Sequence, residues 1–122
     1  MVTFLHTADW QIGMTRRFLG DEAQARFAAA RIDAIRRLGE VAVAQKAEFV
    51  VVCGDVFEAN QLSGQTVRRT LDALAEVPVP VFLLPGNHDP LDVLTIYRTP
   101  LFLQQCPAHV QVLDTSGPLR VR

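Results

Sequence analysis

The sequence has only two cysteines, Cys53 and Cys106, which stand far apart and form no CxxC pair. A disulfide framework or a thiolate metal site needs more cysteines at closer spacing, so we expect two reduced core thiols. No apolar run approaches the roughly 20 residues that cross a bilayer, and the N-terminus lacks the basic and long apolar regions of a secretion signal. These absences predict a cytoplasmic protein with no membrane partner.

The chain also lacks an excess of positive charge, with 12 Lys and Arg, 13 Asp and Glu, and a formal net charge of −1. Domains that bind nucleic acid unaided are usually basic, because contacts to phosphates supply most of the non-specific affinity. Contact with DNA would therefore depend on local arginines, on bound metal ions or on further parts of a longer protein. At 122 residues, the chain has the size of one small domain.

Short apolar runs rich in β-branched residues predict the strands. They cover residues 2–8, 49–53, 81–84 and 110–113. The middle two are continuously apolar, which is typical of strands buried on both faces of a parallel sheet. A turn is expected at 116–118, after the last strand.

Helical patterns separate these strands. The first helix is predicted from Glu22 to about Lys46, with Asp21 as its N-cap. Its apolar stripe consists of Ala28, Ile32, Ile35, Gly39 and Ala42. A second helix is expected to start after Ser63, and a short helix within 91–105 is expected to break before Pro100. The resulting β-α-β-α-β order predicts an α/β fold with a mostly parallel sheet flanked by helices.

Polar residues follow each of the first three predicted strands. Asp9 and Gln11 follow the first, Gly54-Asp55 the second, and Gly86-Asn87-His88-Asp89 the third. Because the carboxyl ends of parallel strands share one edge of a sheet, we expect these side chains to converge. Oxygen and nitrogen donors without a thiol suit Mn²⁺, Fe²⁺ or Zn²⁺.

Each ending alone has a simpler explanation. An aspartate after a buried strand is often a helix cap or a turn former, and Gly-Asn-His-Asp can be a turn with a solvated histidine. Three such endings on three consecutive strands are harder to explain by turn chemistry. Together they favour a metal site.

The strings HTADWQIG at 6–13, VCGDVF at 52–57 and LPGNHD at 84–89 resemble the first three signature blocks of calcineurin-like metallophosphoesterases. They are most similar to the SbcD-type exonuclease subunits of DNA double-strand-break repair. The resemblance covers nearly the whole chain and implies hydrolysis of phosphodiester bonds in DNA. It also implies that residues 1–122 are the N-terminal half of a two-sheet sandwich, in a single domain that continues beyond them.

The resemblance assigns roles residue by residue. Asp9 would bind the first of two divalent ions, with Gln11 beside it, and Asp55 would bridge both. Asn87 would bind the second ion through its amide oxygen. His88 would stand near the scissile phosphate, either to protonate the leaving group or to stabilise the transition state, with Asp89 orienting its imidazole. The two divalent ions, for which Mn²⁺ is the first choice, would generate a hydroxide nucleophile and neutralise charge on the phosphate.

Two departures weaken the site. The family has a histidine where this chain has Gln11, and its later histidine motifs are absent from the 122 residues. After His88 the only histidine is His109, expected to be a surface or strand residue. His6 is expected to be packed, or to support a ligand, rather than to bind metal itself. The sequence therefore predicts part of a metal site and a chain that is inactive by itself. An apolar sheet face is expected to be left exposed, which favours a homodimer.

Three functions remain open. The leading one is a nuclease subunit that acts on DNA with an SbcC-type ATPase, bound through regions absent here. Trp10, Arg16 and Arg17 favour a nucleic-acid backbone weakly. The alternatives are a phosphomonoesterase or cyclic-nucleotide phosphodiesterase with the same metals, and a catalytically silent scaffold.

Overall fold

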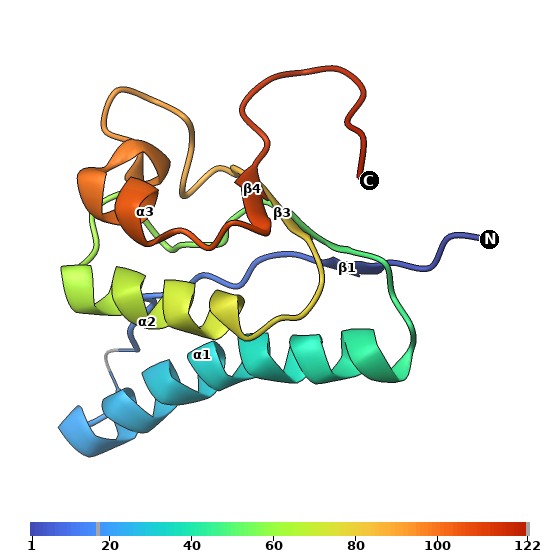
Figure 1. Ribbon diagram of the computed structural model, residues 1–122. Coiled ribbons are helices and arrows are strands. Elements are labelled where there is room, and N and C mark those ends of the chain that lie inside the picture. Colours follow the sequence, from blue (N-terminus) through green and yellow to red (C-terminus); the bar gives the residue numbers. More distant parts are fainter. Residues whose placement is uncertain (17, 122) are drawn as a thin grey trace.

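The computed structural model, which describes residues 1–16 and 18–121, contains one parallel sheet of four strands in the order β1-β2-β3-β4 (Figure 1). The strands are β1 (Leu5–Thr7), β2 (Val50–Cys53), β3 (Val81–Leu84) and β4 (Val110–Val112). The helices are α1 (Asp21–Ala44), α2 (Gly64–Ala75), the 3₁₀-helix η1 (Ile96–Arg98) and α3 (Pro100–Gln105). The predicted α/β fold with a parallel sheet is confirmed.

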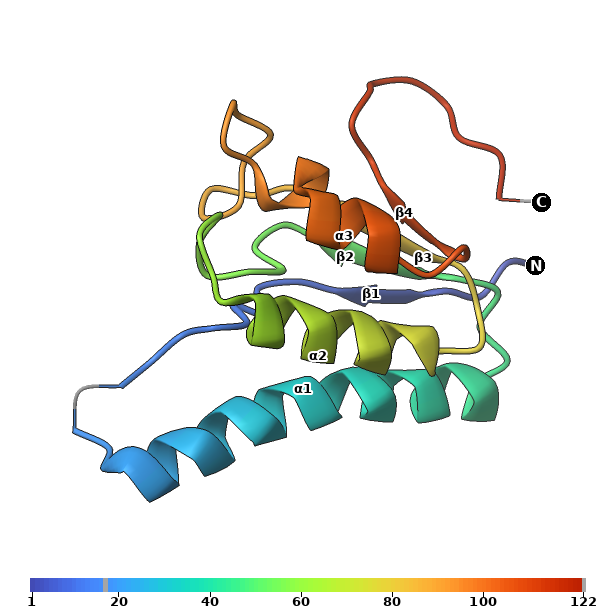
Figure 2. The ribbon, with the colours of Figure 1, turned by 60° about the vertical axis from the view of Figure 1, so that its left-hand side comes forward.

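The strand order places the helices. Each strand lies beside the one that precedes it in the chain, so right-handed crossovers carry every connecting helix to the same face of the sheet. Figure 2 shows α1, α2 and α3 lying next to one another in front of the strands. The core therefore lies between one sheet face and this single layer of helices.

The pairing register divides the strand residues into two faces. One row across the sheet joins Thr7, Val52, Leu83 and Val112, and a parallel row joins Leu5, Val50, Val81 and Val110. In the two central strands these residues are buried under the helices. Burial under the helices explains every second apolar residue of the central strands. The residues between them lie on the opposite face, so the predicted burial of these strands on both faces is only partly confirmed.

The opposite face of the sheet is only partly covered. Its central row consists of His6, Val51, Phe82 and Gln111. Phe82 is buried there by the edge of Phe49, which in turn stacks on Phe4. Phe4 remains 50% exposed and Leu84 42% exposed. The predicted exposed apolar face is thus present.

Both cysteines are free thiols, but they are half-buried rather than in the core. Cys53 pairs with Leu84 across this face.

Helix α1 begins at Asp21, so Gly20 takes the N-cap position that was predicted for Asp21. Four of the five predicted stripe residues are buried, but Ala28 is exposed because the helix start extends beyond the sheet. Gly39 does not interrupt the helix. A Cβ at this position would lie 3.3 Å from the Cα of Val77, so glycine permits the close approach of α1 to the chain after α2.

The caps of the later helices are supplied by hydroxyl groups. The Ser63 side chain accepts the Thr66 N–H at 3.1 Å, as predicted for the start of α2. Pro100 does not end a helix. It occupies the first turn of α3, where a missing N–H costs nothing, and Thr99 caps that helix by accepting from the Phe102 N–H.

Candidate metal centre at the carboxyl ends of the strands

The loops after β1 and β2 run side by side beyond the ends of their strands. The backbone N–H of Asp9 donates to the Gly54 carbonyl at 3.1 Å, and that of Gln11 donates to the Asp55 carbonyl at 2.9 Å. The pairing continues to a parallel bridge between Ile12 and Phe57. Both of these residues are buried, so the loops are anchored in the core where they leave the site.

Three of the predicted ligands have an unusual backbone. Asp9, Gln11 and Asp55 have φ values of 56°, 48° and 54°, in the left-handed region that few residues other than glycine adopt. Aspartate tolerates this region through its short polar side chain, whereas glutamine gains no such help. Conformations of this kind cost about 1–3 kcal/mol each and gather at functional sites. Their occurrence at three of the four predicted ligand positions supports a site here.

The loop after β3 packs directly on Asp55. The Asp55 carboxylate, in a residue only 9% exposed, accepts the backbone N–H of His88 at 2.8 Å through its Oδ1 atom. A Cβ at position 86 would lie 2.4 Å from both the backbone N and the Oδ1 of Asp55. Only glycine leaves room for this approach. The structure therefore joins the endings of β1, β2 and β3 at one edge, as predicted.

Asp89 is placed differently from the prediction. Its side chain is completely buried, and Oδ1 accepts the Gly86 N–H at 2.7 Å. Oδ2 accepts the Phe57 N–H at 3.0 Å and the Tyr97 hydroxyl. The described hydrogen bonds of this carboxylate thus go to two loops and to η1, and none goes to the imidazole of His88. The expected orientation of His88 by Asp89 is not the arrangement in the structure.

Sequence reasoning missed Tyr97. Burial raises the pKa of its phenol above the usual value, and the hydrogen bond to Asp89 raises it further, so the hydroxyl stays protonated and donates. One signal was available, because this is the only tyrosine of the chain and it lies in a partly apolar stretch. A buried tyrosine hydroxyl usually needs a hydrogen-bond partner.

The ligand set is partial. Asp9, Asn87 and His88 are exposed at the edge, and Gln11 is half-buried beside them. Carboxylate and amide oxygens with one imidazole suit a divalent cation of the Mn²⁺ type. Within residues 1–16 and 18–121, however, no three His, Cys, Asp or Glu side chains gather in a way that could hold a metal ion. The described residues fit one side of a metal centre and do not complete it.

The remaining histidines lie elsewhere. His109 Nε2 lies 3.0 Å from the Leu74 carbonyl oxygen at the end of α2. His109 is half-buried in the turn just before β4, rather than on the surface or in the strand. His6 is exposed on the partly covered sheet face, so its expected packing was wrong.

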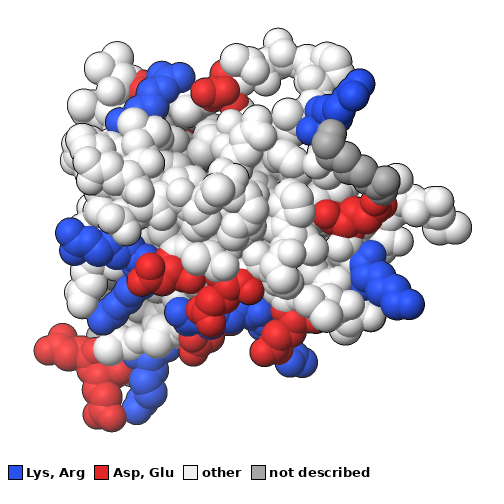
Figure 3. Space-filling model, viewed as in Figure 1, with Lys and Arg blue, Asp and Glu red and all other residues white. Residues whose placement is uncertain are grey.

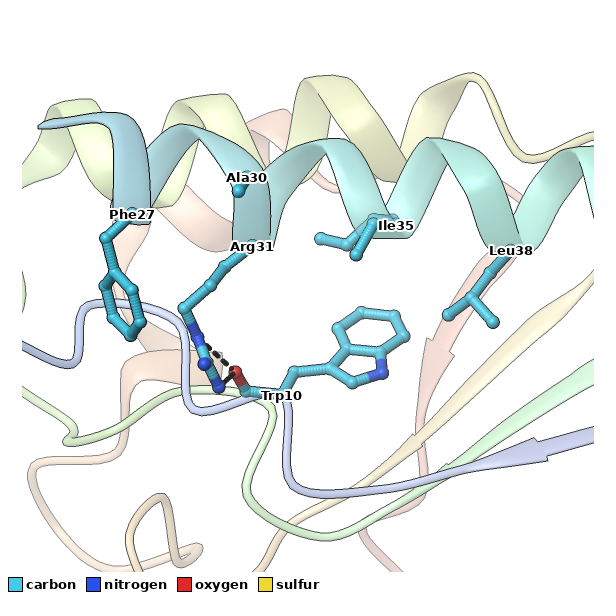
Figure 4. A pocket seen from close by; sticks show the side chains of 7 residues that line it. Trp10, Phe27, Ala30, Arg31, Ile35 and Leu38 are labelled. Atoms are coloured by element: carbon cyan, nitrogen blue, oxygen red, sulfur yellow. Dashed lines mark hydrogen bonds between the residues drawn. The ribbon is translucent and has the colours of Figure 1, made fainter. Parts of the chain in front are cut away.

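Trp10 faces α1. Its indole N–H donates to the Thr7 hydroxyl at 3.0 Å, and its ring lines a pocket of about 310 Å³ with side chains of α1. Figure 4 shows the Arg31 guanidinium reaching from α1 to the carbonyl oxygen of Trp10, with one hydrogen bond of 3.0 Å from Nε. These contacts hold the peptide between Asp9 and Gln11. Trp10 is half-buried in these contacts, and its weak indication of a nucleic-acid backbone stays a prediction.

Charges of both signs alternate on the face shown in Figure 3, around an uncharged centre. On α1, Arg26 pairs with Glu22 at 3.0 Å and Arg37 pairs with Glu40 at 2.8 Å. Arg16 lies over the ring of Phe27, and Arg17 lies outside the described residues. This face offers no continuous basic surface, in agreement with the net charge. No helix in the described ranges is long and apolar enough to cross a membrane.

Comparisons with known proteins agree with the strand-end motifs. The sequence profile of the family described as calcineurin-like phosphoesterase matches residues 2–115. The SbcD component of the nuclease SbcCD from Rhodobacter capsulatus is 37% identical over 119 residues, which cover 93% of this chain and 27% of that protein.

Two further relatives are similar over shorter stretches. The DNA double-strand break repair protein Mre11 of Archaeoglobus fulgidus is 36% identical over 59 residues, covering 46% of this chain and 13% of that protein. The uncharacterized metallophosphoesterase YhaO of Bacillus subtilis is 30% identical over 98 residues, which cover 74% of this chain and 24% of that protein. The chain thus spans about a quarter or less of the length of these relatives.

Proposed function

Because the chain belongs to the calcineurin-like phosphoesterase family, we propose that it supplies one side of a two-metal centre that hydrolyses phosphodiester bonds in DNA. The observation that carries the proposal is the junction of three strand endings around Asp55, with left-handed backbone at Asp9, Gln11 and Asp55. Similarity to a nuclease component and to a DNA repair protein supports DNA as the substrate.

In this proposal each strand ending contributes a ligand. Asp9 and Gln11 belong to one ion, Asn87 to the other, and Asp55 lies between them. The Asp55 Oδ1 atom already accepts the His88 N–H, so the carboxylate is oriented before any ion binds. Divalent ions bound there would lower the pKa of water and offset the charge of the phosphate.

His88 is proposed as the catalytic acid. Its backbone is fixed by the hydrogen bond to Asp55, while its side chain is exposed at the edge where a phosphate would arrive. An imidazole placed there can give a proton to the leaving oxygen. Asp89 contributes by holding the loop rather than by contact with this imidazole.

The missing ligands would come from the rest of a longer protein. The described residues do not assemble three ionisable ligands, and the relatives are several times longer than this chain. We therefore assign activity to the longer protein and expect the 122 residues alone to be inactive. Similarity to one component of the nuclease SbcCD supports assembly with an SbcC-type ATPase through regions outside this chain.

The decisive experiment uses the longer protein with Mn²⁺, on linear duplex DNA and on a small phosphomonoester in parallel. We expect cleavage of the DNA, loss of cleavage after chelation with EDTA and recovery when Mn²⁺ is restored. Hydrolysis of the phosphomonoester alone would favour the small-molecule phosphatase instead. If neither substrate is cleaved while two Mn²⁺ ions bind, the silent scaffold is the better description.

Replacing Gln11 by histidine is expected to raise the affinity for Mn²⁺ by roughly tenfold, because imidazole is a better ligand than a neutral carboxamide. Histidine also adopts the left-handed backbone of position 11 more readily than glutamine does. The measurement is a Mn²⁺ titration followed by electron paramagnetic resonance of the free ion. Gln11→Leu is the control without a ligand atom; equal affinity in all three proteins would mean that position 11 binds no metal.

A further inference from the structure

One buried carboxylate connects three segments that the sequence keeps apart. Asp89 accepts hydrogen bonds from the loop after β2 through the Phe57 N–H, from the loop after β3 through the Gly86 N–H, and from η1 through the Tyr97 hydroxyl. Phe57 lies two residues after Asp55, and Gly86 lies one residue before Asn87. The carboxylate therefore sets the distance between the loops that carry the proposed ligands.

Burial, ring packing and a backbone cap together fix the direction of the Tyr97 hydroxyl. The residue is 2% exposed, and its ring packs edge-to-face on Phe102 with centroids 5.3 Å apart. A second contact to Phe57 has centroids 5.9 Å apart. The buried Thr95 caps the backbone of η1 through its side-chain oxygen, which accepts the Tyr97 N–H. The aromatic cluster and the cap together aim the hydroxyl at Asp89.

We infer that Tyr97 is a positioning residue of the candidate metal centre, which fixes the Asp89 carboxylate and so holds Asn87 and His88 against Asp55. The presence of a metal rests on the proposed function, whereas the positioning rests on the geometry alone. Hydrogen bonds to an ionised acceptor are stronger than those between neutral groups, and each bond in a buried network strengthens its neighbours. Loss of the Tyr97 hydroxyl leaves the two backbone donors as the only described restraints on Asp89.

The site has a reporter of this positioning that needs no metal. The His88 N–H donates to Asp55 Oδ1, so its hydrogen exchange measures how often the loop after β3 leaves Asp55. The Val50 N–H donates to the Pro80 carbonyl at 2.9 Å within the sheet and reports opening of the core. The ratio of the two protection factors separates loop opening from general destabilisation.

The test compares Tyr97→Phe with Phe102→Leu in the 122-residue chain. Tyr97→Phe removes one oxygen and keeps the ring, whereas Phe102→Leu disturbs the same aromatic cluster and keeps the hydroxyl. We expect Tyr97→Phe to lower the protection of His88 relative to Val50 by about tenfold. Phe102→Leu should lower both protection factors together. Weaker Mn²⁺ binding is expected in Tyr97→Phe than in Phe102→Leu.

An unchanged ratio of His88 to Val50 protection in Tyr97→Phe would overturn the inference. So would an equal fall of this ratio in Phe102→Leu, because packing alone would then explain it. If Tyr97→Phe fails to fold, Asp89→Asn replaces it, since this variant keeps the side-chain size and exchanges one acceptor for a donor. Failure of the longer protein to bind Mn²⁺ would count against the proposed function only, because the exchange is measured without metal.

Discussion

Gly86→Ala is expected to lower the free energy of unfolding by about 3 kcal/mol and to abolish measurable Mn²⁺ binding. The added Cβ would lie 2.4 Å from the backbone N of Asp55 and equally close to its Oδ1 atom. Neither atom can move aside easily, because one belongs to the backbone and the other accepts the His88 N–H. The loops after β2 and β3 must therefore separate, which breaks the bond between Asp55 and His88.

Urea unfolding and a Mn²⁺ titration measure the two effects of Gly86→Ala. The matched control is Gly64→Ala in the first turn of α2, where a Cβ would meet only Leu101 Cδ2 at an ordinary distance of 3.4 Å. Alanine favours a helix over glycine by up to about 1 kcal/mol, so the control is expected to be neutral or stabilising. Mn²⁺ affinity that survives Gly86→Ala would show that this close approach is not needed by the site.

Asp89→Ala is the second change with a large expected effect, a loss of at least about 3 kcal/mol of stability. The substitution removes the acceptor of three donors, the N–H groups of Gly86 and Phe57 and the hydroxyl of Tyr97. The position is completely buried, so these donors lose the carboxylate where water has little access. An unpaired buried donor costs about 1–3 kcal/mol.

Asp92→Ala provides the comparison for Asp89→Ala, because it removes the same functional group from a nearby exposed position. Asp92 accepts the Leu94 N–H at 3.0 Å and a longer bond from the Asn60 side chain. Water can replace its oxygen there, so the expected loss in chemical or thermal unfolding is below about 1 kcal/mol. Equal losses in both variants would mean that the Asp89 network contributes no more than a turn cap.

The sequence was most informative where a single local pattern, such as an apolar run or a helix cap, determines the structure. The runs 49–53 and 81–84 predicted β2 and β3 nearly to the residue, because both are short continuous runs of apolar residues rich in β-formers, although one face of the sheet is only partly covered. Ser63 likewise predicted the start of α2, because its side chain forms a local hydrogen bond with the Thr66 N–H. The meeting of the strand endings followed from the geometry of parallel sheets, and the structure brings their loops together as expected.

Predictions failed where the local sequence allowed more than one outcome. Spacing assigns Ala28 to the apolar stripe of α1, but only the tertiary structure determines that the sheet does not reach it. Pro100 can end one helix or begin another, and the neighbouring Thr99 cap decides the outcome. The partner of Asp89 was misassigned because proximity in the chain pointed to His88, whereas the fold supplies Tyr97 and Phe57.

The left-handed residues at the candidate centre imply a conflict between stability and the proposed function. Asp9, Gln11 and Asp55 occupy backbone positions where glycine would relieve strain, yet glycine has no ligand atom. Screening for a more heat-resistant form of this chain should therefore favour substitutions at the very positions that we propose as metal ligands. A library selected only for stability would first lose the ligand side chains of the candidate centre. A library selected only for metal binding would keep the residues with strained backbone.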